Sequence, residues 1–444
     1  MIHKLMSMAY CATRLPGALS YIREADRLYH SSRETMMTHQ EEKYRRLVQY
    51  AYHHVPYYHR IFDGIGLFEG GNLREDRLSQ IPVLTKETLR EEQENMYSDE
   101  MKLRRPYSAA TSGSTGIPLT IWYDRHYMVR NRADKFFMGQ LNGRDLGKPE
   151  LKMWFRDFDL YQKNGKNKDR FYNFFTNRTF RLASVVSEEA LKEYIDTINA
   201  VRPVQIWSNP APIFEVSKYI LSHGIRVRCP RSIILTSNPL YDEMRETMQR
   251  AFPGTWIVDQ YGGTEFGVVA CSIREGRNLR IFEHSARVEV LDEAGKLQPH
   301  GTGDIVITGL NNYSMPLIRY RMGDMVTVLP YGQDKEGSFG SISRVMGRRL
   351  SMLRRRDGTS VTGLHLRDLL TKPWIRTFQL IQHSYDDLEA MVVLDGTPEQ
   401  HREDLDQIAS QLRKIMDTEC RFTFCDNLSP EKTGKYFYVR SELE

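Results

Sequence analysis

The sequence has no long hydrophobic run, although 40% of its 444 residues are hydrophobic. A helix that spans a bilayer needs about 20 consecutive, mainly apolar residues, and no stretch of the chain reaches that length. The N-terminal segment contains Lys4 and several apolar residues, but Thr13, Arg14 and Pro16 break up the apolar core that a secretory signal requires. We therefore expect an N-terminal helix in a cytoplasmic protein with no membrane partner.

Cysteine is scarce and unevenly placed, at Cys11, Cys229, Cys271, Cys420 and Cys425. An odd number at scattered spacings does not suggest a disulfide framework. The last two cysteines lie close together, so a zinc site is one interpretation. No second pair accompanies them, which favours ordinary reduced cysteines.

The chain also lacks a strong excess of one charge. Lys and Arg total 62 and Asp and Glu total 57, a net charge of +5. Nucleic-acid-binding proteins usually concentrate their positive charge, so we expect no nucleic-acid partner. The densest basic cluster, at Arg348, Arg349 and Arg354 to Arg356, fits either a solvated loop or an anion contact.

The length suggests two or three domains. Residues 40–60 have helical apolar spacing, which Pro56 should end. Thr85 is expected to cap a second helix. Between residues 200 and 310, short apolar runs alternate with helical stretches, which favours βαβ units and a parallel sheet.

Later segments have a different pattern. Residues 281–309 resemble strands joined by glycine-rich turns, which indicates antiparallel or barrel-like structure. Residues 341–363 show little periodicity and mark a boundary. Beyond it we predict a small α/β unit with strands near 376–382 and 389–394, a helix at 399–417 and a strand at 421–425.

The predicted fold class is therefore α/β, with two domains. Residues 1–346 are expected to form a large domain of mostly parallel sheets flanked by helices, with a small β-barrel-like part. Residues 347–444 are expected to form a small, separate α+β domain.

A loop rich in glycine and hydroxyl groups follows Tyr107. Its core is Thr111, Ser112, Gly113, Ser114, Thr115 and Gly116. Glycine lets backbone amides turn toward one point, and hydroxyls add donors without bulk, so such a loop can hold a polyphosphate. The spacing differs from that of a Walker A loop. By itself, a stretch rich in serine and glycine is more often a flexible surface loop.

Together with Pro118, this loop resembles the signature of the adenylate-forming superfamily, and within it the phenylacetate–CoA ligase family and its capsule-biosynthesis relatives. Four later segments resemble further motifs of that family in the same order. They are YGGTE at Tyr261–Glu265, RYRMGD at Arg319–Asp324, GRR at Gly347–Arg349 and TGK at Thr433–Lys435.

The resemblance implies a nucleotide site. The loop from Thr111 to Gly116 would hold the β- and γ-phosphates of ATP, and Thr264 would contact the α-phosphate. The remaining implied cofactor-binding residues are Tyr261 on the adenine face, Asp259 at its amino group, Gln260 and Gly262 beside them, Ser237, Asn238 and Pro239 across the base, Asp324 on the ribose, and Arg348 on the ribose or phosphates.

The resemblance also implies catalytic groups. Glu265 would hold Mg²⁺, a hard cation that prefers carboxylate and phosphate oxygens. Lys435 would approach the α-phosphate and carboxylate oxygens from a mobile C-terminal domain, with Lys432 as a rival. Each residue also has an ordinary interpretation. Glu265 could begin a helix, Tyr261 could be a core residue, and Asp324 could cap a turn.

The implied activity is activation of a carboxylic acid by ATP to an acyl-adenylate, with release of pyrophosphate and transfer to CoA. Alternatives are transfer to an amine, a hydroxyl or a carrier-protein thiol, or a binding module without catalysis. Trp207, Ser208, Asn209 and Phe266 lie in segments that could line the acid pocket or simply pack the core. The sequence leaves open the acid, the acceptor and the choice between monomer and homodimer.

Several positions depart from the family pattern. Ile117 stands where many members have lysine, Met322 replaces threonine, and Asn238 replaces an acidic residue. Leu350 and Ser351 replace the acidic hinge pair, and this departure affects the expected domain rotation most. This departure therefore bears on the second half-reaction and not on adenylation.

Overall fold

The structure is a computed structural model that describes residues 2–111, 119–154, 170–183, 187–333, 337–348, 352–357, 360–362, 366, 369–370, 372, 374–428 and 438–443. The chain divides into two compact units, Met1–Met322 with Val326–Val345, and Gly323–Met325 with Met346–Glu444. No helix in these ranges is both long and apolar enough to cross a membrane.

The N-terminal helices begin and end where local chemistry requires it. The first unit contains the helices α1 (Ile2–Arg14), α2 (Ala18–Tyr29), α3 (Arg33–His54), α4 (Pro56–Gly64), α5 (Lys86–Glu92), α6 (Arg125–Leu141), α8 (Glu188–Val201), α9 (Pro210–His223) and α10 (Asp242–Ala251). Pro56 ends α3 and occupies the first turn of α4. The Thr85 side chain accepts from the Thr88 amide, which confirms the predicted cap of α5.

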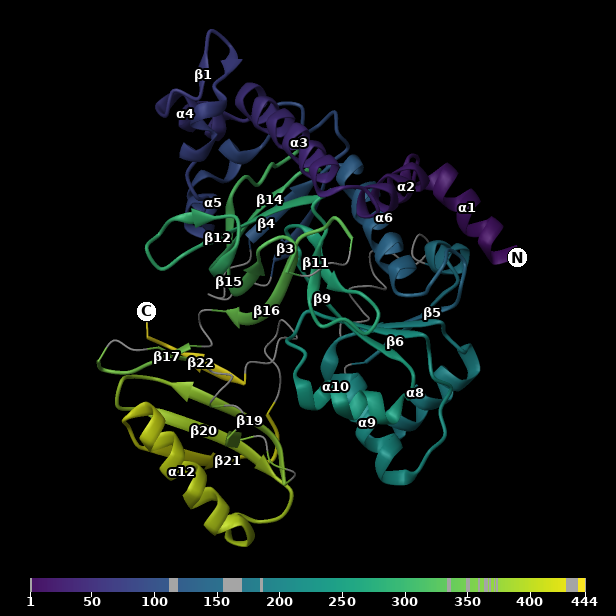
Figure 1. The fold of residues 1–444 in the computed structure, drawn as a ribbon. Helices are drawn as coiled ribbons and strands as arrows, with labels where there is room; N and C mark the ends of the chain where they lie inside the picture. The colour runs from purple at the N-terminus through teal and green to yellow at the C-terminus, as the bar shows by residue number, and fades with distance from the viewer. Residues whose placement is uncertain are drawn as a thin grey trace. The chain divides into compact units, whose positions relative to one another are not determined.

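Within the described ranges, twelve strands form one sheet in the order β13-β12-β14-β15-β16-β11-β10-β9-β8-β7-β5-β6 (Figure 1). Their bounds are β5 (Glu150–Trp154), β6 (Arg178–Leu182), β7 (Gln205–Ser208), β8 (Ser232–Thr236), β9 (Trp256–Gly263), β10 (Gly267–Ser272), β11 (Leu279–Ile281), β12 (Ala286–Leu291), β13 (Leu297–Gln298), β14 (Gly301–Gly309), β15 (Tyr320–Leu329) and β16 (Ser341–Arg348). Two hairpins stand apart, β1 (Phe68–Glu69) with β2 (Asn72–Leu73), and β3 (Tyr107–Thr111) with β4 (Leu119–Tyr123).

Strands β6, β5, β7, β8 and β9 are parallel. The alternation between residues 200 and 310 predicted β7, β8 and β9 among them. The antiparallel strands β12 and β14 arise from the segment predicted to be antiparallel, and they belong to the same continuous sheet. Helices α8, α9 and α10 cover one face of the parallel part. Helix α6 packs against the other face, where Phe137 meets Trp207 and Val258.

The second unit has its own core. The strands β19 (Ile375–Gln382), β20 (Leu388–Leu394), β21 (Cys420–Phe424) and β22 (Val439–Ser441) form a four-stranded sheet that packs against α12 (Arg402–Met416). These elements match the predicted strands and helix. The segment 341–363, which showed no periodicity, contains β16 and the short hairpin of β17 (Met352–Arg354) and β18 (Ser360–Thr362). All five cysteines are free thiols.

Candidate active site

Three parallel strands end side by side at the part of the sheet that carries half of the predicted site residues. Ser208 on β7 pairs with Leu235 on β8, and Leu235 pairs with Asp259 on β9. Open α/β sheets bind ligands at the carboxyl ends of their parallel strands. The segments that leave these ends contain Asn209, Ser237 to Pro239, and Thr264 with Glu265.

The turn after β8 has an unusual backbone. Ser237 has a φ of 75°, in the left-handed region that non-glycine residues seldom occupy. Such conformations persist where the surrounding fold imposes them, and they concentrate at functional sites. Because Thr236 pairs with Gln260, this turn starts beside Gln260 and Tyr261. The structure therefore brings together the two segments predicted to lie on either side of the adenine.

The turn between β9 and β10 is tight and depends on glycine. Gly263 pairs with Gly267, and Gly262 pairs with Val268. A Cβ atom at Gly262 would lie 1.9 Å from the carbonyl oxygen of Gly267, so no larger residue fits. Thr264 is exposed at the tip and Glu265 is half-buried beside it. The alternative that Glu265 begins a helix is wrong, because it lies in a β-turn.

Strand β4 and helix α6 support this turn. The Tyr123 hydroxyl donates to the carbonyl oxygen of Thr264, and its ring stacks on Tyr127 at 4.7 Å and 13°. A Cβ at Gly267 would lie 2.5 Å from Asn131 Oδ1, so the Asn131 side chain lies against the turn. Burial, followed by the Glu265 carboxylate, raises the pKa of the Tyr123 phenol and keeps it protonated as a donor.

Glu265 fits the chemistry of a magnesium ligand. Its carboxylate lies 2.7 Å from where a Cβ of Gly263 would be, so the turn leaves space for it only because residue 263 is glycine. The described part of the chain contains no group of three or more His, Cys, Asp or Glu that could hold a metal by itself. One carboxylate is sufficient when substrate phosphates and water supply the other oxygens, as Mg²⁺ commonly requires.

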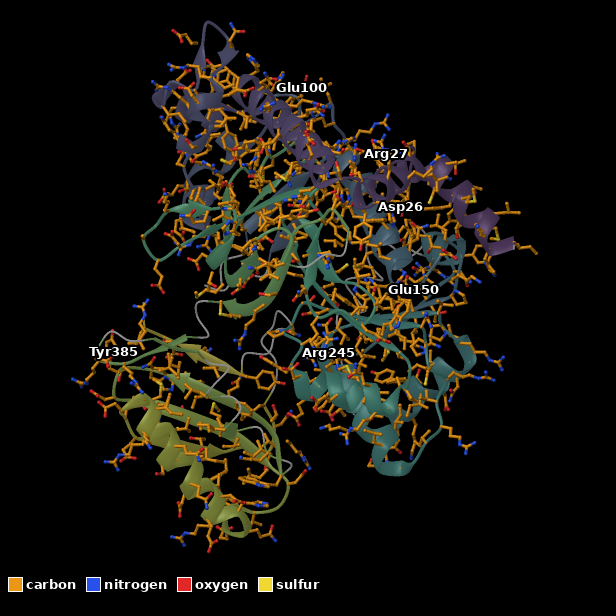
Figure 2. All side chains as sticks on the ribbon, viewed as in Figure 1. Asp26, Arg27, Glu100, Glu150, Arg245 and Tyr385 are labelled. Atoms are coloured by element: carbon orange, nitrogen blue, oxygen red, sulfur yellow. The ribbon has the colours of Figure 1, made fainter. Side chains whose placement is uncertain are left out.

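Asp259 lies in the middle of β9 and faces helix α10. Burial raises its pKa to about 6, against the opposing effect of Arg245 on α10, which is labelled in Figure 2. Arg245 also donates to the carbonyl oxygen of Ile257, and the amide of Asp259 donates to Ser272 Oγ at 3.0 Å. The carboxyl is therefore held in place, and its adenine contact stays a prediction.

Within the RYRMGD segment, the two arginines stabilise the fold and Met322 reaches the candidate site. Arg319, which is 5% exposed, donates to Glu289 and to the carbonyl oxygens of Leu78, Ser79 and Ile81. Arg321 pairs with Asp304. Met322 Cε would lie 2.9 Å from a Cβ of Gly263, so this segment reaches the β9–β10 turn.

The structure describes some of the remaining predicted site residues and not others. Asp324 is half-buried within strand β15, not in a turn. Thr111 ends β3 and pairs with Leu119, so the two ends of the predicted phosphate loop meet. Arg348 ends β16. Ser112, Gly113, Ser114, Thr115, Gly116, Leu350, Ser351, Lys432 and Lys435 lie outside the described residues.

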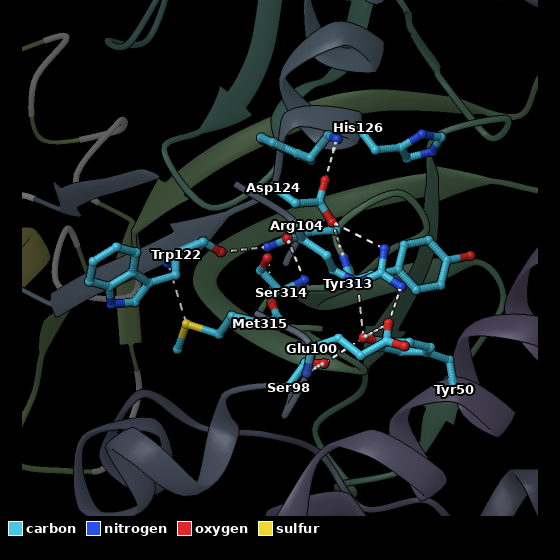
Figure 3. Close-up of polar contacts among 12 residues, drawn as sticks. Tyr50, Ser98, Glu100, Arg104, Trp122, Asp124, His126, Tyr313, Ser314 and Met315 are labelled. Atoms are coloured by element: carbon cyan, nitrogen blue, oxygen red, sulfur yellow. Dashed lines mark hydrogen bonds and ion pairs between the residues drawn. The ribbon is translucent and has the colours of Figure 1, made fainter. Parts of the chain in front are cut away.

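Sequence reasoning missed the polar network that fixes the start of α6 (Figure 3). Asp124, which is 1% exposed, accepts from the amides of Tyr127 at 2.6 Å and Tyr313 at 3.1 Å. Arg104 lies 4.0 Å from the same carboxylate and donates to Glu100 at 2.7 Å. An aspartate directly before a helical pattern is a capping signal that could have identified Asp124.

A cavity of about 670 Å³ lies elsewhere, between α2 and the end of α6. Arg23, Asp26, Tyr29 and Arg274 help to line it, and Asp26 is labelled in Figure 2. Its lining contains none of the predicted site residues. We therefore place the candidate active site at the strand ends and not in this cavity.

Comparison with known proteins agrees with this geometry. No protein-family model matches the chain. Protein CapK of Staphylococcus aureus is 23% identical over 80% of this chain and 78% of its own length. A phenylacetate-coenzyme A ligase of Thermus thermophilus is 25% identical over 67% of each chain. The crystal structure of a 2-hydroxyisobutyryl-CoA ligase in its postadenylation state superposes with a TM-score of 0.71 at 14% identity, covering 92% of this chain and 89% of that one.

The fold is therefore that of the adenylate-forming superfamily. Within that class, the chain is a relative of the phenylacetate–CoA ligases and of CapK. The resemblance drawn from the five motifs is confirmed.

Proposed function

We propose that the protein activates a carboxylic acid with ATP and then transfers the acyl group to coenzyme A. In the first step, a carboxylate oxygen attacks the α-phosphorus and the bond to pyrophosphate breaks. In the second, the thiol sulfur attacks the carbonyl carbon, loses its proton and displaces AMP. The observation that carries the proposal is the β9–β10 turn, which presents Thr264 and Glu265 at the ends of three parallel strands.

The residues of this turn suit a reaction in which two anions must meet. Catalysis of phosphoryl transfer depends mainly on positioning and on electrostatic stabilisation. Tyr123 and Asn131 hold the turn from one side, and Met322 holds it from another. Glu265 would hold Mg²⁺, which supplies positive charge to the phosphate oxygens when bound. Thr264 would contact the α-phosphate, and Tyr261 and Ser237 to Pro239 would enclose the base.

Lys435 is proposed to neutralise charge between the carboxylate and the α-phosphate, and Asp324 to bind the ribose. CoA is the acceptor that the names of the relatives favour, since one is a phenylacetate-coenzyme A ligase and the structural neighbour is a 2-hydroxyisobutyryl-CoA ligase. A cytoplasmic location, expected from the sequence, provides ATP, Mg²⁺ and CoA together.

Acid-dependent exchange of pyrophosphate into ATP tests adenylation. We expect exchange with at least one acid of a panel of aromatic and aliphatic acids, and formation of the acyl-CoA, seen by mass spectrometry, when CoA is added. Replacing Lys435 with Ala should lower the exchange rate by at least about a hundredfold, because a lost electrostatic contact to the transition state is typically this large. Lys432→Ala is the matched control, since it removes a lysine from the same segment.

Equal loss in both lysine variants, or normal exchange in Lys435→Ala, would remove Lys435 from the mechanism. Exchange without any acyl-CoA would leave adenylation intact and redirect the search to an amine, hydroxyl or carrier-protein acceptor. A folded protein that binds no ATP would be a binding module.

A further inference from the structure

Three cationic side chains surround the indole of Trp207 near the end of β7. Lys135 Nζ on α6 lies 5.9 Å from the ring centroid, Lys152 Nζ on β5 lies 5.3 Å away, and Arg178 Cζ on β6 lies 5.9 Å away. Lys152 pairs directly with Trp207 across the sheet, so both side chains lie on the face that α6 covers.

The carboxylates that act on the Lys135 ammonium are those of Asp134 and Glu150, and Asp134 pairs with His284. Glu150 is labelled in Figure 2 and is 1% exposed. It already pairs with Arg178 and lies 3.7 Å from Arg144. Lys135 forms no hydrogen bond or ion pair with any residue that the structure describes. Burial, followed by Arg178 and Arg132, lowers its pKa to about 8, which leaves it mostly protonated at neutral pH.

Buried polar atoms without partners lie at the same place. Trp207 and Asn209 are each 5% exposed, and neither Trp207 Nε1 nor Asn209 Oδ1 has a hydrogen-bond partner in the described ranges. Native proteins contain few such atoms, and each requires an explanation, because leaving a buried polar group unpaired costs free energy. A ligand that accepts from an indole N–H and from ammonium groups provides that explanation.

Helix α6 connects this cluster to the candidate active site. Its residues Tyr127, Asn131 and Lys135 follow one another at four-residue spacing and therefore share a face. Tyr127 stacks on the tyrosine that holds the β9–β10 turn, Asn131 lies against Gly267, and Lys135 lies over Trp207. Eight helical residues span about 12 Å, so a ligand along this face has one end at the turn and the other at the cations.

We propose that the acid activated by this protein has a second anionic group, and that Lys135, with Lys152 and the Trp207 indole N–H, binds that distal anion. This inference rests on the proposed adenylation and specifies its substrate class, an extended dianionic acid. A short acid or a purely apolar one would bring no anionic group to Lys135 and the indole donor.

Matched acids test the proposal. Octanedioate and octanoate form one pair, and 4-carboxyphenylacetate and phenylacetate form another. The measured quantity is the ratio of kcat/KM for pyrophosphate exchange between the dianion and its monoanion. We expect the wild type to favour the dianion, and Lys135→Gln to lower that ratio by about tenfold or more, the effect of one charge-assisted hydrogen bond. Lys135→Arg keeps the charge and should keep most of the preference.

Lys218→Gln is the matched control. Lys218 lies on α9, on the opposite face of the sheet, and its ammonium is 5.0 Å from the ring of Phe214, so the variant also loses one charge and one cation–π contact. The ratio should be unchanged in this variant. A ratio that Lys135→Gln leaves unchanged, or a wild type that favours the monoanions, overturns the inference while the proposed function stands.

Failure of the proposed adenylation can be distinguished from failure of the proposed anion site. If no acid supports exchange, adenylation of these acids is refuted, and calorimetric titration of octanedioate decides the binding question. Heat of binding to the wild type that is lost in Lys135→Gln and kept in Lys218→Gln supports the anion site. Equal titrations in all three proteins, or none in the wild type, overturn it.

Discussion

Two positions along helix α6 differ in whether the buried polar groups beside them have partners. At its start, the oxygens of Asp124 accept from two backbone amides, and Arg104 lies beside them (Figure 3). Eleven residues further along, Lys135 lies over Trp207, whose indole N–H has no partner in the described part of the chain. A polar group with its partners in place stabilises a fold, whereas an unpartnered one destabilises it. The Asp124 network therefore holds the start of the helix, whereas the groups around Lys135 and Trp207 are available for a ligand.

The largest expected effect on stability comes from disrupting the Asp124 network at the start of α6. Asp124→Ala should lower the free energy of unfolding by about 3 kcal/mol, because it removes the helix cap and leaves the Tyr313 amide and Arg104 without their acceptor. Urea denaturation measures this change. The control is Asp196→Ala, an exposed aspartate in the middle of α8, which should change stability by less than about 0.5 kcal/mol. Similar small changes in both variants would contradict a structural role for the Asp124 network.

The Asp124 network also illustrates what the sequence could and could not predict. Asp124 directly precedes a helix, which is a local signal, but Tyr313 lies 189 positions away and only the folded chain brings it to the carboxylate. Arg319 stands inside a recognisable motif, yet its guanidinium is bound by Glu289 and three carbonyl oxygens, so its role is to hold the 78–81 segment. A motif identifies such residues in the sequence, but it does not identify their hydrogen-bond and ion-pair partners.

Elements with strong local patterns were predictable. The alternation after residue 200 gave the parallel strands β7, β8 and β9, and the C-terminal pattern gave β19, β20, α12 and β21. The continuous sheet was not predictable, because β11 pairs with β16 across about 60 residues of chain that contain other strands. The residue pattern within a strand does not identify the partner strand when that partner lies far away in the sequence. The same reason hid the cluster around Trp207, whose cations come from α6, β5 and β6.

An intermediate effect is expected at Asp259, which has an opposing arginine but incomplete compensation for its burial. Its pKa is raised to about 6 in the folded chain, above the ordinary value of an unfolded aspartate. The folded state therefore binds more protons than the unfolded state between about pH 4 and 6, and stability falls as pH rises through this window. Asp259→Asn should be close to wild-type stability at pH 4 and more stable by about 2 kcal/mol at pH 7.5.

Thermal or urea unfolding at the two pH values measures that difference. Asp242→Asn is a suitable control, because Asp242 is exposed on the same helix as Arg245 and pairs with Arg277. Lower stability of Asp259→Asn at pH 7.5 would mean that attraction to Arg245 outweighs burial. Asp259 would then be a partnered buried group, as Asp124 is.

The smallest change in stability should come from Trp207, beside Lys135. Trp207→Phe keeps an aromatic ring in the core cluster and removes the indole N–H, which has no partner to lose. Filling less space destabilises, whereas removing an unsatisfied buried donor stabilises, so the two contributions oppose each other. We expect a net change within about 1 kcal/mol, together with a loss of about threefold in the preference for dianionic acids. Trp256→Phe removes an indole from the same sheet and should leave that preference unchanged. A loss of stability comparable to that of Asp124→Ala would show that the Trp207 indole is part of the structural network. The Asp124 network and the groups around Trp207 would then have the same structural role.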